Sequence, residues 1–281
     1  MSFLKNPMLS RRQLLLAGGA TLVTAGLPTG RASATAPKQR IFKLATGANS
    51  RVQLAPDPHP QTRVWAYNGK VPGPEIRARQ GDRLRVDVTN GLAEETTVHW
   101  HGLRVPVSMD GVPHLTQKPI KADGGTFSYE FDVPDAGTYW YHPHQRSFEQ
   151  VGRGLYGALI VEEREPIRVD RDVTWVLDDW RLERDAQIAA DFGNRRDASH
   201  NGRVGNTVTI NGRILETFNV RRGERIRLRL INAANARIFA LKFAEHEPWI
   251  IALDGQPITP HKATDGMVVL GPAMRVDLIL D

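Results

Sequence analysis

The chain repeats itself at an interval of 142 residues, and this repeat limits the folds that it can adopt. Residues 78–90 read ARQGDRLRVDVTN, and residues 220–232 read VRRGERIRLRLIN. A glycine, an acid, alternating arginine and apolar residues, and a final asparagine recur in the same order. Upstream, Asn68-Gly69 matches Asn211-Gly212 at nearly the same interval. Solenoid repeats have periods of roughly 20–50 residues, so an interval this long indicates two copies of a whole domain.

Both copies have the pattern of β-strands. Asp82–Val88 alternates polar and apolar residues, as a strand with one buried face does, so Leu84, Val86 and Val88 are expected to point inward. The second copy alternates in the same way, and we expect its arginines to form a solvated strand face rather than a nucleic-acid patch. These arginines are Arg225, Arg227 and Arg229.

Short apolar runs separated by many glycines and prolines recur along the rest of the chain. They predict further strands at Phe127–Val133, Gly157–Glu162, Val173–Leu177, Thr207–Ile210, Ile250–Leu253 and Arg275–Leu280. Many short strands between turns favour an all-β fold of two tandem antiparallel Greek-key β-sandwiches. We place the first domain at residues 35–164 and the second at residues 165–281.

The first 34 residues have the features of an export signal. Arg11-Arg12 precedes an apolar stretch over residues 14–27 that is too short to span a bilayer comfortably, and Ala32-Ser33-Ala34 is a typical cleavage site. The two arginines resemble the twin-arginine signal, and Arg31 beside the cleavage site favours that route over an ordinary secretory signal. We therefore predict a signal peptide over residues 1–34 and a mature protein in the periplasm or outside the cell.

Removal of this leader changes the interpretation of the charge. The leader carries four basic residues and no acid, so the formal charge of +6 falls to near +2 in the mature chain. A charge this small gives no support for a nucleic-acid partner. No other apolar run approaches a membrane span, so we expect no membrane association after signal removal. The chain contains no cysteine, so its core cannot depend on disulfides.

Two His-x-His pairs carry the clearest chemical signal. They are His99-Trp100-His101 and His142-Pro143-His144. Residues i and i+2 of a strand point to the same side, so each pair directs two imidazoles at one place, with Trp100 on the opposite side in the core. Imidazole suits copper and zinc, whereas calcium and magnesium prefer oxygen ligands. Pairs of this kind, taken alone, also occur as ordinary histidines or zinc sites.

The flanks of both pairs resemble the copper signatures of the multicopper oxidases. The first signature is His99-Trp100-His101-Gly102, followed by Met109-Asp110-Gly111-Val112-Pro113. The second is Trp140-Tyr141-His142-Pro143-His144, followed by Gln150 and residues 154–160. The resemblance extends over about residues 40 to 281. It implies cupredoxin-like domains, a copper cofactor, and an oxidase that couples one-electron oxidation of a reducing substrate to reduction of O2 to water.

The resemblance also implies a role for each histidine. His99 matches a ligand of the type 2 copper, and the type 3 copper pair is matched by His101, His142 and His144. In the family these three coppers form the cluster that reduces O2, and a separate type 1 copper oxidises the substrate. Asp110 is a candidate for holding a ligand imidazole, although Asp110-Gly111 is also typical of a turn. The remaining histidines are expected to be ordinary surface or loop residues: His59, His114, His200, His246 and His261.

The chain lacks the other parts of the machinery that the resemblance implies. A type 1 copper needs a cysteine thiolate, and this chain has none. Only four of the eight cluster ligands are present, and Leu241-Lys242-Phe243, at the repeat interval from the first pair, offers no imidazole. We therefore expect a second sandwich that is incomplete at its C-terminal end, and a third domain or another subunit that completes the cluster. The isolated chain is expected to be inactive, and its reducing substrate cannot be read from the sequence.

Two alternatives follow from the same residues. The chain could be a periplasmic protein that holds copper without turnover, or a scaffold protein that has lost its copper ligands. Retention of all four histidines speaks against the scaffold.

Overall fold

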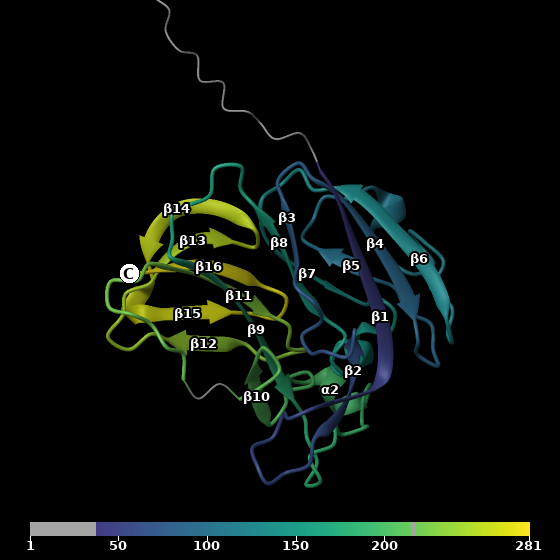
Figure 1. Ribbon diagram of the computed structural model, residues 1–281. Coiled ribbons are helices and arrows are strands. Elements are labelled where there is room, and N and C mark those ends of the chain that lie inside the picture. The colour runs from purple at the N-terminus through teal and green to yellow at the C-terminus, as the bar shows by residue number, and fades with distance from the viewer. Residues whose placement is uncertain (1–37, 215–216) are drawn as a thin grey trace, which may run out of the picture. The chain divides into compact units, whose positions relative to one another are not determined.

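The computed structural model describes residues 38–214 and 217–281, so the predicted leader at residues 1–34 lies outside the described residues. The described part is almost entirely β-structure (Figure 1). No helix in residues 38–214 or 217–281 is long and apolar enough to cross a membrane.

Residues 39–162 form two four-stranded sheets. The first sheet has the order β2-β1-β4-β6 and consists of β1 (Gln39–Val52), β2 (Thr62–Tyr67), β4 (Arg83–Asn90) and β6 (Gly125–Asp132). The second sheet has the order β3-β8-β7-β5 and consists of β3 (Ile76–Arg79), β5 (His99–His101), β7 (Gly137–His142) and β8 (Gly157–Glu162). The core between the two sheets holds Leu84, Val86 and Val88, as predicted.

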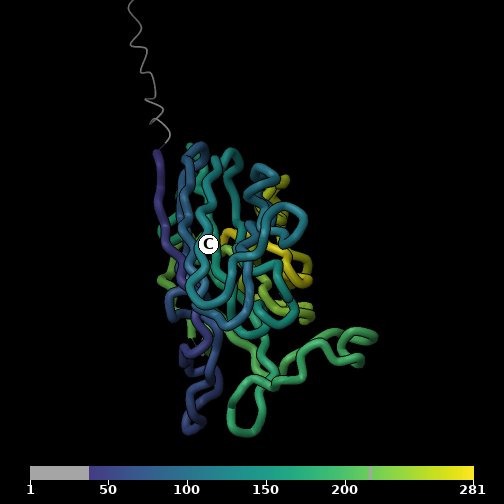
Figure 2. Tube along the Cα trace, turned by 90° about the vertical axis from the view of Figure 1, so that its right-hand side faces the viewer, coloured from purple at the N-terminus to yellow at the C-terminus, as the bar shows by residue number. Residues whose placement is uncertain are grey.

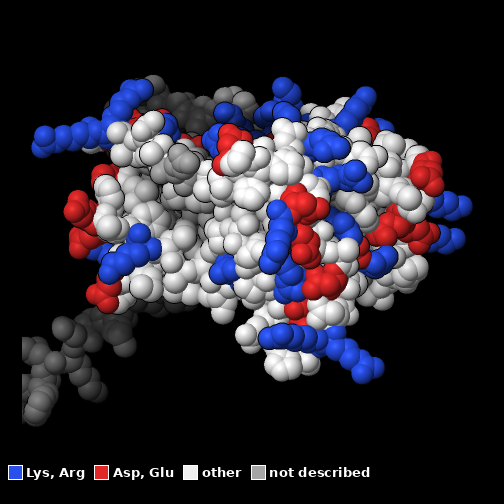
Figure 3. Space-filling model, turned by 90° about the horizontal axis from the view of Figure 1, so that it is seen from below, with Lys and Arg blue, Asp and Glu red and all other residues white. Residues whose placement is uncertain are grey.

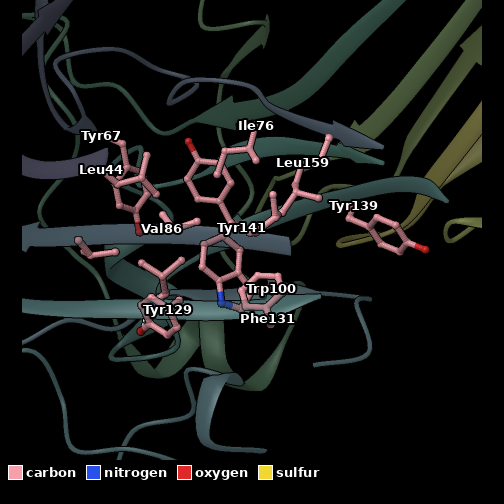
Figure 4. Close-up of a cluster of buried hydrophobic side chains, with 14 of the residues drawn as sticks. Leu44, Tyr67, Ile76, Val86, Trp100, Tyr129, Phe131, Tyr139, Tyr141 and Leu159 are labelled. Carbon is pink, nitrogen blue, oxygen red and sulfur yellow. Dashed lines mark hydrogen bonds between the residues drawn. The ribbon is translucent and has the colours of Figure 1, made fainter. Parts of the chain in front are cut away.

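Trp100 is the largest buried side chain of this core. Its ring lies 5.3 Å from that of Tyr129 and 5.0 Å from that of Phe131, and Figure 4 shows it beside Tyr141. These contacts confirm the expectation that Trp100 points away from its two histidine neighbours. They also anchor the short strand β5 to the sheet opposite.

Residues 171–280 form the other two sheets. The six-stranded sheet has the order β10-β9-β11-β16-β13-β14 and consists of β9 (Arg171–Trp180), β10 (Thr207–Ile210), β11 (Ile226–Asn232), β13 (Trp249–Leu253), β14 (Gln256–Lys262) and β16 (Arg275–Leu280). The two-stranded sheet pairs β12 (Phe239–Lys242) with β15 (Met267–Leu270). Among the described residues β16 is the last strand, whereas its counterpart β6 is followed by β7 and β8.

The two copies of the sequence repeat make equivalent hydrogen bonds. Asn68 and Asn211 both have a φ of 52°, in the left-handed region that asparagine tolerates. Asn68 bonds through its side chain to backbone groups of β1, and Asn211 does the same to β9. β4 and β11 also occupy equivalent places, each pairing parallel with the first strand of its half and antiparallel with the last strand of its sheet.

The parallel pairs depart from the prediction of antiparallel sandwiches. β1 with β4, β3 with β8, and β9 with β11 all run parallel. Parallel neighbours need a crossover between them. The chain provides one, because the strands between β1 and β4 include β3, which belongs to the opposite sheet.

In the described ranges, 38–214 and 217–281, helices are few and short. α1 (Ser147–Gln150) follows β7 directly, and α2 (Arg195–Ser199) lies in the long connection between β9 and β10. The other two are 3-10 turns, η1 (Val107–Met109) and η2 (Thr264–Gly266). In Figure 2 the green connection between β9 and β10 projects away from the sheets.

The expectation of a solvated arginine face on β11 was wrong for two of the three arginines. Arg227 and Arg229 are 3% and 0% exposed, because β7 of the first half packs beside β11 and β16. Both guanidinium groups donate to the buried carboxylate of Asp277, at 2.7 and 3.1 Å. Asp277 also accepts from Thr138 of β7 at 2.6 Å. Alternation alone does not reveal that β7 of the first half covers the polar face of β11.

Many of the other charged residues are on the surface, although Asp82, Asp178 and Arg275 are also buried. On the face in Figure 3, Lys and Arg side chains lie among Asp and Glu side chains, so both signs of charge are mixed there.

Candidate metal centre

Strand pairing brings the two His-x-His pairs together. β5 and β7 are antiparallel neighbours, with His99 opposite His142 and His101 opposite Trp140. Because alternate residues of a strand share a face, His99, His101, Trp140 and His142 all lie on the same side of this sheet. His144 follows β7 by two residues, and its backbone N–H donates to the hydroxyl of Thr97 at 3.1 Å.

The four imidazoles meet at one place. The ring centroid of His99 lies 5.7, 5.4 and 5.4 Å from those of His101, His142 and His144, respectively. Possible ligand atoms of His99, His101 and His142 all lie within 4.8 Å of one another. His144 is the most exposed of the four and lies at the edge of this group. The arrangement predicted from the sequence is therefore present in the structure.

Backbone carbonyls orient two of the rings. His99 Nδ1 lies 2.7 Å from the carbonyl oxygen of Asp110, and His142 Nδ1 lies 2.9 Å from that of Pro143. Carbonyls only accept, so each Nδ1 carries the proton and each Nε2 keeps a free lone pair for a metal. The hydrogen bond between Asp110 and His99 is made by the backbone carbonyl of Asp110, and its carboxylate lies 3.4 Å from the same Nδ1. Gly111, with a φ of +78°, lies so close to the backbone of Val98 that a β-carbon would collide with it.

Trp140 is a residue of the site that our sequence analysis did not assign. Its ring stacks on that of His101, with centroids 5.1 Å apart, and lies 4.2 Å from that of His142. The signal was present in the sequence, because Trp140 stands two residues before His142 and so shares its face. The stacking restricts rotation of both imidazoles.

Burial keeps the imidazoles in the form that binds metal. It lowers the pKa of His101 from 6.5 to about 4 and that of His142 to about 3, and the nearby charge of Arg275 adds to the effect on His101. Burial also lowers the pKa of His99. All three are therefore neutral near pH 7, and only neutral imidazole offers a lone pair to a metal ion.

The second half of the chain closes one side of the site. A cavity of about 630 Å³ has the four histidines on one wall. The rest of its lining comes from the helix α1, from the connection between β9 and β10, and from the turns before β12 and β16. Apart from Asn235, the residues that these turns contribute are small and apolar: Ala233, Ala234, Pro272 and Ala273. No motif in the sequence predicts that the second half lines the site.

A copper ion fits this donor set. The three-histidine group contains no carboxylate, which argues against calcium or magnesium. His101 Nδ1 lies 3.2 Å from His142 Nε2. Two imidazole nitrogens that bind one metal ion at about 2.0–2.1 Å with a tetrahedral angle are about 3.3 Å apart, so the spacing suits a shared ion.

Comparison with known proteins identifies the metal. Two sequence profiles described as multicopper oxidase match residues 48–166 and 171–281. The structure is similar to the crystal structure of a blue copper oxidase from Nitrosomonas europaea, with 35% identity, a TM-score of 0.74, and coverage of 86% of this chain and 76% of that one. The chain belongs to the multicopper oxidase family. Copper is therefore its cofactor, and its sheets are those of cupredoxin-like domains.

Other multicopper oxidases are similar over most of this chain. A crystal structure from Pseudomonas thermotolerans has 40% identity and a TM-score of 0.82, covering 87% of this chain and 58% of that one. The multicopper oxidase MmcO of Mycobacterium tuberculosis is 31% identical over 94% of this chain and 56% of its own length. The chain spans between 38% and 56% of the length of these curated relatives.

Proposed function

We propose that this chain is the copper-binding N-terminal portion of a multicopper oxidase that couples one-electron oxidation of a substrate to reduction of O2 to water. In this proposal it provides half of the ligands of a three-copper cluster. His99 binds the type 2 copper, and the ligands of the type 3 pair are His101, His142 and His144. The observation that carries the proposal is the convergence of four imidazoles from β5 and the end of β7.

The residues of the chain would bind the copper and orient the imidazole rings that hold it. Copper supplies the one-electron redox chemistry. The Asp110 and Pro143 carbonyls hold His99 and His142 with Nε2 free, and Trp140 restricts the rings of His101 and His142. The second half contributes apolar side chains, such as Ala233 and Ala273, and polar ones, such as Arg203 and Asn235, to the cavity lining.

The remaining parts of the proposal rest on the sequence. Residues 1–34 are a twin-arginine signal, and the mature protein works in the periplasm or outside the cell. Residues 35–164 and 165–281 are the two domains, in keeping with strands that divide between β8 and β9. A third domain or another subunit supplies the other cluster ligands and the type 1 copper, and the reducing substrate is unassigned.

Copper titration of the chain without its leader tests this proposal. We expect Cu(II) binding with nitrogen ligands in the electron paramagnetic resonance (EPR) spectrum, weakened strongly in His101→Ala and His142→Ala. His59→Ala and His261→Ala change exposed histidines outside the site and serve as matched controls. Equal binding by all four variants would contradict the assignment.

Oxidase assays on the same sample test the incompleteness. We expect no turnover with phenols or metal ions as reductants, and no intense blue band, because the chain has no cysteine to form a type 1 site. A blue, active preparation of this chain alone would overturn that part of the proposal.

A further inference from the structure

A buried arginine of the second half reaches the strands that carry the histidines. Arg275 opens β16, and its side chain is 5% exposed. Its guanidinium donates to the carbonyl of Thr138 in β7 at 3.3 Å, to that of Ala273 at 3.0 Å, and to that of Asp254 at 2.9 Å. The Asp254 carboxylate lies 3.3 Å from the same guanidinium.

The guanidinium also contacts the chain directly after His101. Gly102 has a φ of +86°, and a β-carbon at this position would collide with Arg275 Nη2. The side chain of Arg275 therefore occupies the space that glycine leaves free at the end of β5. One group thus joins the end of β5, the start of β7 and the turn at Ala273, which lines the cavity.

These contacts require an arginine. Burial of a charge costs several kcal/mol unless hydrogen bonds and a counter-charge compensate it. Here three carbonyls point at one group from different directions, and the planar fork of arginine donates to all three. Lysine places its donors on a single nitrogen and cannot span them.

We propose that Arg275 is a positioning residue that sets the place of the His101 ring relative to His142. This inference rests on the proposed copper site. Arg275 does not contact the metal; it fixes the backbone on both sides of the pair, at Gly102 after His101 and at Thr138, four residues before His142.

The test compares Arg275→Met and Arg275→Lys with the unmodified chain and with Arg227→Met. Arg227 is a matched control, because it is equally buried and ion-paired in the same sheet but bonds to Asp277 and Glu163. Each variant is measured for unfolding free energy, for Cu(II) affinity by competition with a chelator, and for its EPR spectrum. Asp254→Asn, at a half-exposed residue, is a milder perturbation in case Arg275→Met does not fold.

We expect Arg275→Met to lower Cu(II) affinity by about 10- to 100-fold and to change the EPR spectrum, as loss of residues that orient metal ligands does. Arg275→Lys should show the same altered spectrum, and Asp254→Asn a smaller loss in the same direction. Arg227→Met should lose stability but keep the spectrum.

Three results would overturn the inference. The first is an unchanged affinity and spectrum in folded Arg275→Met, or in Asp254→Asn if the former does not fold. The second is a normal spectrum in Arg275→Lys, and the third is an equal loss in Arg227→Met. Copper binding that fails in the unmodified chain would refute the proposed function as well, whereas normal binding with unaffected Arg275 variants refutes only this inference.

Discussion

Replacement of Asp277 by asparagine should destabilise the protein strongly. Asp277 is 1% exposed and faces two buried guanidinium groups, those of Arg227 and Arg229. Asparagine has the same shape but no charge, and its amide NH2 group would face the N–H donors of the two guanidinium groups. Breaking a buried ion pair costs about 3–5 kcal/mol. Because Arg227 keeps Glu163 and Arg229 keeps Asp172, we expect the lower end, about 3 kcal/mol.

Denaturant unfolding followed by tryptophan fluorescence measures this loss, and thermal unfolding should show a melting temperature lower by about 6–12 °C. Arg225→Ala is the control, since Arg225 belongs to the same alternating series but is half-exposed, and its ion pair with Asp281 is exposed too. It should change stability by less than about 0.5 kcal/mol. A loss below about 1 kcal/mol in Asp277→Asn would show that the network is solvated, and the account of the interface between the halves would fail.

Three further predictions follow. Below pH 6.5 the unfolded state binds more protons than the native state at His101 and His142, whose pKa values are lowered to about 4 and about 3. The metal-free chain should therefore lose stability as the pH falls from 6.5 towards 4. Denaturant titrations at several pH values measure this, and the unfolding free energy of His142→Gln should depend less on pH. Asn211→Ala should cost about 1–2 kcal/mol in the same assay, because it removes two backbone contacts and places alanine at a positive φ; an effect near zero would contradict this reason. Trp140→Leu should weaken Cu(II) binding in a chelator competition more than Trp140→Phe, and equal affinities would show that ring stacking is unimportant.

The sequence predicted the features that depend on local pattern. Alternation in Asp82–Val88 is read from a few neighbouring residues, and the repeat extends it to the second half. The convergence of the histidines was also predictable, because each pair fixes two side chains on one face. The family resemblance then supplied the metal and the proposed role of each histidine.

Features that depend on long-range packing could not be predicted. Arg227 and Arg229 alternate as a solvated face would, and only the packing of β7 against β11 buries them. Arg275 contacts Thr138, 137 positions away, and no local pattern reveals such a contact. The parallel pairing of β1 with β4 likewise depends on which sheet each intervening strand joins.

The most direct test of the central claim is a crystal structure of the copper-loaded chain, with anomalous scattering recorded at the copper edge. We predict anomalous density at which His101 Nδ1 and His142 Nε2 are both directed, and separate density at Nε2 of His99. Copper bound only at other residues, or ring nitrogens of these three histidines turned away from the density, would contradict the claim.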